Sequence, residues 1–420
     1  MAESSPHGGN EEAGAPVEAG GGAPAGPVLL LTGARLADGR VVDVRIGGGR
    51  IEAVGVSGGA APALGEDVRS VDLTGYLLLP APAEPHAHLE LAHTAGSPEA
   101  PSESFEVVLR RIVEAALEFL GNGATAVRTH VRVDALHGLG GVEAAVKARG
   151  LLFGLTKLQV VAVPRVLTGP SGADGRALLR DALKLGADVV GGCPDLDPDP
   201  VGHAEVVLGL ADEFGVGVDL HTDGADPARL TRVAAMAGGL RGRVALGPAA
   251  ELGRLPLDVA GRVGHRLAAS GVRVVCLPQG GCGMSGHGPA PVRMLRAAGV
   301  GMAAGAGAIR DAANPVGRAD PLLSAYQLVA GGRLGPDEAY AAVAGGARAA
   351  LGLDEVRVEA GFPADLLAVR GQGIGEALAG ACSRIVVHAG RIVSRTSAVR
   401  EFTDAVGVAL PRQGGGSAGG

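Results

Sequence analysis

The chain has 420 residues, of which 72 are glycine, 47% are hydrophobic and 19% are charged. Disordered chains are polar and highly charged, and collagen needs glycine at every third position, so this composition excludes both classes. The net charge is −7, with three Tyr, six Phe and no Trp, so we expect no nucleic-acid partner. Of the classes considered, a large globular protein is the one that this composition allows.

The two ends of the chain differ from the rest in composition. Residues 1–26 are mostly Gly, Ala, Pro, Ser and Glu, and the last residues of the segment 401–420 have a similar composition. We therefore expect both segments to be mostly disordered. The N-terminus lacks a signal-peptide pattern, and no uncharged apolar run reaches the roughly 18 residues of a membrane span. The four cysteines form no C-x-x-C pair. We therefore expect a cytoplasmic protein with reduced thiols and no membrane partner.

Short β-strands are predicted inside both tails. They are Val41–Ile46, Arg50–Gly55, Ala364–Arg370 and Arg384–Arg395. Three glycines join the first two strands, which predicts a tight hairpin turn. A small β unit built from both ends of the chain would flank a central domain.

Eight short apolar runs then alternate with Ala-rich stretches of helical character. The runs are Leu77–Pro80, Thr125–Val131, Leu158–Val163, Asp188–Gly192, Gly217–His221, Arg243–Leu246, Val272–Pro278 and Val300–Gly305. The predicted helices include Glu106–Leu120, Arg176–Leu185, Gly202–Phe214 and Pro227–Ala237. This alternation indicates a parallel sheet covered by helices, and eight units fit a (β/α)8 barrel. The alternative, an open doubly wound sheet, lacks a G-x-G-x-x-G motif after its first strand.

Three histidines stand at predicted strand ends, where such barrels carry their functional groups. His86 and His88 follow the first predicted barrel strand and are two residues apart, so in an extended segment they point the same way. His221 ends the fifth predicted strand. Three neutral imidazoles and a water molecule make a competent tetrahedral zinc site, whereas the alternative is three ordinary polar residues.

These motifs resemble the amidohydrolase superfamily, and most of all its branch of bacterial cytosine deaminases. The fragments that carry the resemblance are PHAHLE, RTHVRVD, LQVVAVP, GADVVGG, DLHTD, NPVGRADPL and GFPADLLAV. The resemblance implies a (β/α)8 barrel over residues 81–354 and a small β-sandwich from residues 27–80 and 355–400. It also implies one divalent ion, Zn or Fe, and hydrolysis of a non-peptide C–N bond in a cyclic amide, amidine or aminoheterocycle.

The same resemblance assigns roles to individual residues. It makes His86, His88 and His221 the metal ligands, Gln159 a group that binds the substrate amide, and His130 a residue near the pocket. The implied partner is a small heterocyclic molecule. The oligomeric state stays open, a homo-oligomer included.

Three positions depart from the family pattern and predict a degenerate active site. Gly224 stands where the family has a proton-shuttling glutamate, and Pro248 stands where it has a histidine beside the metal. Gly307 replaces an aspartate that binds the metal and serves as the base. General acid–base groups contribute typically about 10²–10⁴-fold to rate, so efficient deamination is not expected. Asp223, two residues after His221, is the best replacement for these groups.

Two functions remain open. The first is a metal-dependent hydrolase with rearranged proton transfer, and the second is a catalytically dead pseudoenzyme that keeps the barrel to bind a ligand or partner. The glycine-rich segment Gly280–Gly288 predicts a loop over the pocket. Other polar residues on predicted loops are better explained as exposed or capping residues; they are Glu90, Asp134, Asp226, His287 and Asp311.

Overall fold

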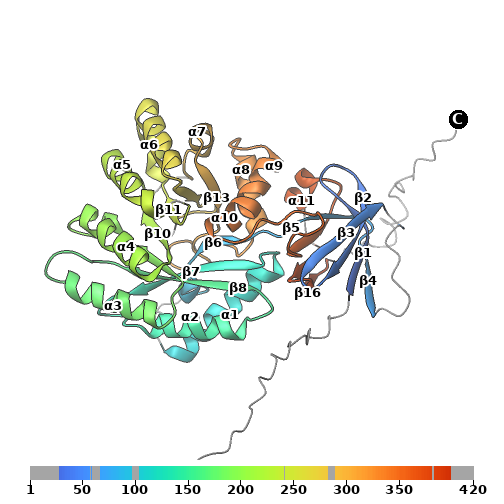
Figure 1. Cartoon of the computed structure of the whole chain (residues 1–420), viewed down its shortest axis with the longest axis horizontal. Helices are drawn as coiled ribbons and strands as arrows, with labels where there is room; N and C mark the ends of the chain where they lie inside the picture. Colours follow the sequence, from blue (N-terminus) through green and yellow to red (C-terminus); the bar gives the residue numbers. More distant parts are fainter. Residues whose placement is uncertain are drawn as a thin grey trace, which may run out of the picture.

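The computed structural model describes residues 28–56, 58, 67–96, 104–240, 242–281, 289–380 and 383–398. The chain forms a barrel surrounded by helices, and beside it a smaller sheet built from both ends of the chain (Figure 1). The tails predicted at residues 1–26 and 401–420 lie outside the described residues, as do Cys282 and His287.

The barrel consists of eight parallel strands, each paired with the next in chain order. They are β6 (Glu84–Ala87), β7 (Ala126–Val133), β8 (Lys157–Pro164), β9 (Val189–Gly192), β10 (Gly217–Thr222), β11 (Val244–Pro248), β12 (Arg273–Cys276) and β13 (Gly301–Ala304). A parallel bridge joins Ala87 to Gly307, and the Gly307 N–H donates to the His86 carbonyl at 3.0 Å. This contact brings the first strand against the segment after the last one. The predicted (β/α)8 fold is confirmed.

Helices cover the outside of the barrel and connect its strands (Figure 1). The main ones are α1 (Phe105–Gly121), α2 (Gly140–Leu151), α3 (Gly172–Lys184), α4 (Pro200–Phe214), α5 (Pro227–Met236), α6 (Leu257–Ala269), α7 (Val292–Ala297), α8 (Pro321–Ala330), α9 (Pro336–Ala341) and α10 (Ala347–Ala350). A further helix, α11 (Ile374–Gly380), lies between strands of the smaller sheet in chain order. Short turns are η1 (Leu89–Leu91), η2 (Pro194–Leu196), η3 (Ala237–Leu240), η4 (Ala250–Arg254) and η5 (Ala342–Gly346). The four helices predicted from sequence are confirmed as α1, α3, α4 and α5.

Three of these helices begin with the same local signal. Asp199, Asp226 and Asp320 each stand before a proline, and each carboxylate accepts a backbone N–H of the first turn of α4, α5 or α8. Aspartate satisfies the free N–H groups at a helix start, and proline fits the first helical position. Asp226 is therefore a capping residue.

The second sheet, which we call the terminal sheet, takes five strands from the start of the chain and three from its end. They are β1 (Val28–Arg35), β2 (Val41–Gly47), β3 (Arg50–Val56), β4 (Val68–Asp72), β5 (Tyr76–Pro80), β14 (Leu366–Arg370), β15 (Arg384–His388) and β16 (Arg391–Thr396). Antiparallel pairing of β5 with β14 joins the two groups. The strands predicted near both ends are confirmed.

One strand prediction is wrong. The run Leu77–Pro80, predicted as the first barrel strand, belongs to β5 of the terminal sheet, and the first barrel strand is β6. Leu77 and Leu79 pack into the main core of the barrel, whereas Leu78 packs into the core of the terminal sheet. Because β5 is buried on both faces, its sequence has the same continuous apolar pattern as a barrel strand.

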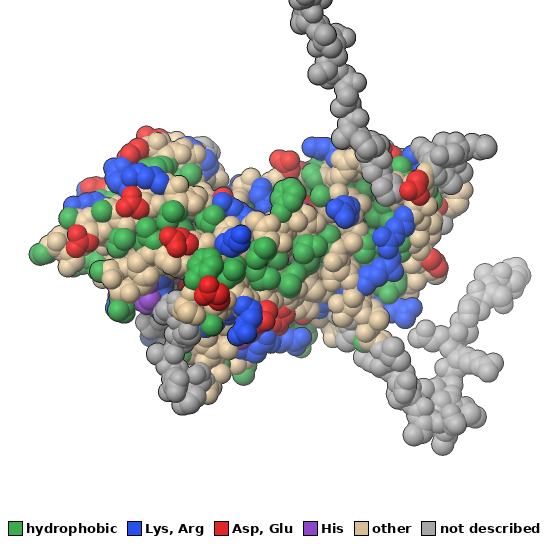
Figure 2. Space-filling model, turned by 90° about the horizontal axis from the view of Figure 1, so that it is seen from below, with side chains coloured by type: hydrophobic (Ala, Val, Ile, Leu, Met, Phe, Trp, Pro, Cys, Tyr) green, Lys and Arg blue, Asp and Glu red, His purple; other side chains and the backbone are tan. Residues whose placement is uncertain are grey.

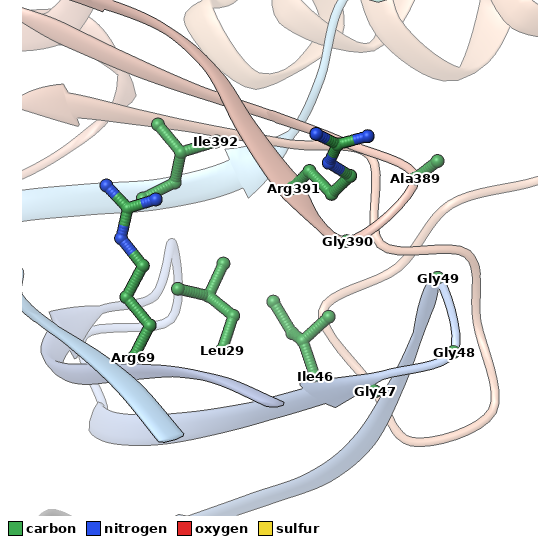
Figure 3. A pocket seen from close by; sticks show the side chains of 10 residues that line it. All are labelled: Leu29, Ile46, Gly47, Gly48, Gly49, Arg69, Ala389, Gly390, Arg391 and Ile392. Carbon is green, nitrogen blue, oxygen red and sulfur yellow. The ribbon is translucent and has the colours of Figure 1, made fainter. Parts of the chain in front are cut away.

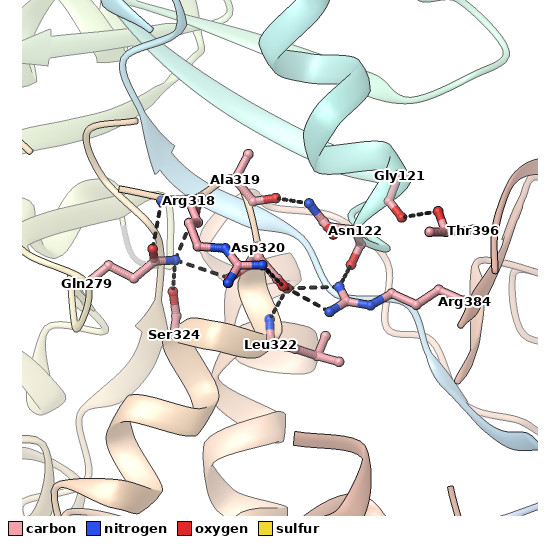
Figure 4. Close-up of polar contacts among 10 residues, drawn as sticks. All are labelled: Gly121, Asn122, Gln279, Arg318, Ala319, Asp320, Leu322, Ser324, Arg384 and Thr396. Atoms are coloured by element: carbon pink, nitrogen blue, oxygen red, sulfur yellow. Dashed lines mark hydrogen bonds and ion pairs between the residues drawn. The ribbon is translucent and has the colours of Figure 1, made fainter. Parts of the chain in front are cut away.

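Buried polar contacts attach the terminal sheet to the barrel (Figure 4). Arg384 on β15 donates to both carboxylate oxygens of Asp320, at 2.8 and 2.9 Å, and to the Asn122 carbonyl at 2.6 Å. Asp320 also caps α8, so one carboxylate serves both the helix and the junction. Gln279, after β12, donates to the Ser324 hydroxyl of α8 at 3.0 Å.

A cavity of about 490 Å³ lies in the terminal sheet, beside the turns that follow β2 and precede β16 (Figure 3). Leu29, Ile46 and Ile392 form apolar walls, and Arg69 and Arg391 lie beside them. All its lining residues belong to the terminal sheet or its turns, so this cavity is separate from the barrel interior.

The molecular surface mixes side chains of both charges. The face in Figure 2 carries Lys and Arg near Asp and Glu, with hydrophobic side chains between them. Within the described ranges, no helix has the length and apolar character needed to span a membrane.

Candidate metal centre

Four histidine rings come together inside the barrel. His86 lies on β6, His88 directly follows it, His130 lies on β7 and His221 on β10. The ring centroid of His86 is 4.1 Å from that of His130 and 4.4 Å from that of His221. The centroid of His88 is 5.1 Å from that of His221. The three histidines predicted as metal ligands, and His130, therefore meet as neighbouring side chains.

We call His86, His88 and His221 the mouth group. Their possible ligand atoms all lie within 4.8 Å of one another. The Nε2 atoms of His88 and His221 are 3.2 Å apart, and two nitrogens bound to one tetrahedral zinc ion lie about 3.3 Å apart, given the usual Zn–N bond. The Nδ1 and Nε2 of His86 and the Nδ1 of His221 are buried without a hydrogen-bond partner. These residues fit the divalent ion that the sequence predicted.

The protonation state of the mouth group also suits metal binding. Burial, together with the nearby His130 and Arg132 side chains, lowers the pKa of His88 to about 3. Burial together with the other histidines holds the pKa values of His86 and His221 well below the ordinary value. At neutral pH these imidazoles are therefore neutral, which is the form that binds metal ions.

Asp219 is a buried acid that our reading of the sequence missed. It lies on β10, two residues before His221, so both side chains share one face of the strand. Its Oδ2 accepts from the Arg128 guanidinium at 2.8 Å, and its Oδ1 lies 3.4 Å from the His130 Nε2. Burial opposes ionisation, but His130 and Arg128 outweigh it and lower the pKa of Asp219. The signal was a charged residue inside an otherwise buried strand.

Gln159 lies near the start of β8, and both polar atoms of its side chain form hydrogen bonds within the protein. Its amide oxygen accepts from Arg128 at 3.1 and 3.0 Å, and its amide nitrogen donates to the Leu351 carbonyl at 2.9 Å. The register pairs Arg128 with Gln159 and His130 with Val161, so Gln159 lies deeper in the barrel than His130. Substrate binding by Gln159 and His130 stays a prediction.

Asp223 follows β10 and is half-buried. Its carboxylate accepts from the Ala225 N–H at 2.9 Å, and its own N–H donates to Asp195 at 2.9 Å. Asp195 also accepts from the Thr222 hydroxyl, and burial raises its pKa. Two carboxyl groups thus lie just beyond His221, and the proton-handling role of Asp223 stays a prediction.

The three positions that depart from the family pattern offer no ionisable group. Gly307 has a φ of +77°, and a Cβ there would lie 3.1 Å from Leu277 Cδ1. Gly224 has a φ of +81°, and a Cβ there would lie 3.4 Å from Leu252 Cβ. Pro248 ends β11. At both glycines an apolar side chain lies where a larger residue would project.

The remaining polar residues from the sequence make local contacts. Asp134 accepts from the His137 N–H at 2.9 Å, and Asp311 accepts from the Asn314 N–H at 3.0 Å. Glu90 is buried in η1, with its Oε1 4.0 Å from the Arg132 Nε. Asp134 and Asp311 therefore stabilise turns, in line with the interpretation that they are loop or capping residues.

Comparisons with known proteins identify the family of the chain. The sequence model of the amidohydrolase family matches residues 90–394, beginning just after His86 and His88. No curated protein matches the sequence.

Among solved structures, N-isopropylammelide isopropylaminohydrolase from Burkholderia multivorans ATCC 17616 has a TM-score of 0.78 at 27% identity, covering 88% of this chain and 99% of that one. A 5-methylcytosine deaminase from Klebsiella pneumoniae has a TM-score of 0.78 at 23% identity, covering 90% and 100%. An adenosine deaminase from Xanthomonas campestris with bound zinc has a TM-score of 0.67 at 19% identity, covering 91% and 96%. The chain belongs to the amidohydrolase family.

Proposed function

We propose that this protein holds one divalent ion, Zn or Fe, in the mouth group and hydrolyses a non-peptide C–N bond of a small heterocycle. The observation that carries the proposal is the convergence of His86, His88 and His221, whose possible ligand atoms lie within 4.8 Å of one another, with both ring nitrogens of His86 buried without a hydrogen-bond partner. Family membership supports the hydrolase class. Two structural neighbours are named for action on N-isopropylammelide and 5-methylcytosine, which supports a heterocyclic substrate.

The chemistry divides between the ion and the chain. A bound zinc or iron ion would supply Lewis acidity and lower the pKa of water. His86, His88 and His221 hold the ion, and the half-buried Asp223 is the group we assign to proton transfer. Gly224 and Gly307 carry no carboxylate. Compared with an enzyme that has an acid or base at these positions, we therefore expect turnover to be slower by about 10²–10⁴-fold for each missing group.

Metal content of the protein purified without added metal tests this proposal. We expect about one ion per chain in the native protein and almost none in His86→Ala or His221→Ala, because each variant removes a ligand. His265→Ala, an exposed histidine on α6, is the matched control and should keep the ion. A native protein without Zn or Fe that also takes up neither ion would refute the proposal.

A second candidate is a pseudoenzyme that binds a ligand or partner without turnover. Leu277, which lies where a side chain at position 307 would project, favours it. A panel of cyclic amides, amidines and aminoheterocycles separates the candidates. Turnover that disappears in His86→Ala supports the hydrolase, and a metal-loaded protein inactive on the whole panel supports the pseudoenzyme.

The proposal also covers location and partners. We propose a cytoplasmic protein whose partner is a small heterocyclic molecule, with no nucleic acid and no membrane involved. Cys276 is buried as a free thiol, which is the form that a reducing compartment maintains. Labelling of this thiol in protein unfolded directly from cells would check that it is reduced.

A further inference from the structure

The histidine cluster contains a second set of converging ligand atoms. His86, His130 and Asp219, which we call the deep group, have possible ligand atoms within 4.8 Å of one another, and all three side chains are fully buried. Asp219 and His130 come from β10 and β7, so the deep group joins three strands, whereas the mouth group joins only β6 and β10. The two groups share His86.

The distances inside the deep group favour an ion over a direct hydrogen bond. His130 Nε2 and Asp219 Oδ1 are 3.4 Å apart, beyond the usual hydrogen-bond range of about 2.7–3.2 Å. Neither atom has a hydrogen-bond partner, although both are buried. Two ligand atoms on one tetrahedral zinc ion are separated by about 3.3 Å, so an ion between these atoms would satisfy both.

The other contacts of the deep group orient its ligand atoms. Arg128 donates to Asp219 Oδ2 at 2.8 Å and leaves Oδ1 on the His130 side. The Nδ1 of His130 points to the Ala87 carbonyl at 3.4 Å, which is equally long for a hydrogen bond, so Nε2 is the nitrogen on the Asp219 side. Outer contacts of this kind are what fix metal ligands in place. The positive charge of Arg128 opposes a cation, and the Asp219 carboxylate offsets it.

We propose that His86, His130 and Asp219 form a second binding position for a divalent transition-metal ion, deeper in the barrel than the mouth group. Two imidazoles and one carboxylate are a known zinc ligand set. Because both positions need His86, one ion occupies either the mouth group or the deep group. The inference rests on the proposed function only in requiring that the barrel binds a divalent ion.

The deep position has a consequence for activity. Its three ligands are fully buried, whereas His88 of the mouth group is half-buried. A heterocycle that reaches the mouth group therefore has no comparable access to an ion held by His130 and Asp219. Protein with the ion in the deep position would contain metal without turning over substrate.

Cobalt titration of the full-length metal-free chain, followed by visible absorption, tests the deep position. In the double variant His88→Ala/His221→Ala the mouth group is lost, and we expect binding of about one Co²⁺ to persist. Adding His130→Ala or Asp219→Asn should then weaken this binding at least about tenfold. The double variant His88→Asn/His221→Asn repeats the test with smaller packing changes, and thermal unfolding of each metal-free variant verifies its fold.

The possible failures are distinguishable. If the native chain binds Co²⁺ but neither folded double variant does, the deep position is refuted and the proposed function stands. If the native chain binds no divalent ion, both are refuted. X-ray absorption of the zinc-loaded double variant adds a direct measurement of the ligands: two imidazoles and one carboxylate support the deep group, and a ligand shell without a carboxylate contradicts it.

Discussion

The strands that line the barrel interior carry polar or apolar groups there, and we call these two linings the polar side and the apolar side, although β10 lies across the barrel from β6. The polar side is formed by β6, β7 and β10, with His86, His130, Asp219 and His221. The apolar side is formed by β11, β12 and β13, with the separate cluster Ala245, Val275, Leu277 and Ala303. Leu246 and Val274, the alternate residues, join the main core instead, so this small cluster faces inward.

The difference between the two sides separates what the fold requires from what the chemistry requires. Gly307 closes the barrel through its backbone, with its N–H on the His86 carbonyl, and needs no side chain to do so. The barrel can therefore replace ionisable groups by glycine and leucine on one side and keep its topology. Metal binding depends on side chains, so we expect it only where the polar side retains them.

The largest effect is expected when a metal ligand on the polar side is removed. His86→Ala removes a ligand from both the mouth group and the deep group, so bound zinc should fall from about one ion per chain to nearly none. Metal analysis after dialysis measures this loss. Val275→Ala, on the apolar side, is the control and should keep the ion; equal loss in both variants would contradict the comparison.

The next effect concerns the charge pair beneath the histidines. Asp219→Ala leaves the Arg128 guanidinium buried without its carboxylate, which should lower the free energy of unfolding by about 3–5 kcal/mol. Urea denaturation measures the change. Asp38→Ala, whose pair with Arg40 is exposed, should change it little. An equally small change for Asp219→Ala would show that Arg128 does not depend on the pair.

A third prediction concerns a variant that adds a charge to the apolar side. Gly307→Asp must adopt a φ of +77° beside Leu277, so we expect a loss of about 1–3 kcal/mol in unfolding free energy. Adding Leu277→Ala makes room for the carboxylate, and Co²⁺ affinity should then rise on the order of tenfold over Leu277→Ala alone. No gain in the folded double variant would mean that position 307 does not reach the ion.

The smallest effect, counted per pH unit, is the contribution of one histidine to the pH dependence of stability. His86, His88 and His221 have depressed pKa values in the fold, so below about pH 6.5 the unfolded chain binds more protons than the native one. Stability of the metal-free protein should fall as pH drops from about 6.5 towards 3, by up to about 1.4 kcal/mol per pH unit for each histidine.

The difference between the native protein and His86→Ala in the pH dependence of unfolding free energy gives the contribution of one histidine. It cancels the opposite contribution of Glu84, whose pKa burial raises to about 8. The slope between pH 4 and 6 should be shallower in His86→Ala, as urea denaturation at several pH values would show. Identical slopes would contradict a neutral buried His86.

Several features of the fold and the site could be predicted from local patterns. The apolar runs that became β7 to β13 alternate with helices at regular intervals, and this spacing is enough to indicate the barrel. The H-x-H spacing of His86 and His88 puts both on one side of an extended segment. β6 itself could not be predicted, because Glu84–Ala87 is four residues long and contains no apolar run.

The sequence by itself determined the family, the alternation of strands and helices, and the shared side of His86 and His88, because these depend on residue type and short-range spacing. Only the tertiary structure decided that Asp219 lies against Arg128, 91 residues away, and that Leu277 lies beside Gly307. Both contacts are formed by parallel strands closing into a barrel, which brings together side chains whose separation along the chain carries no signal.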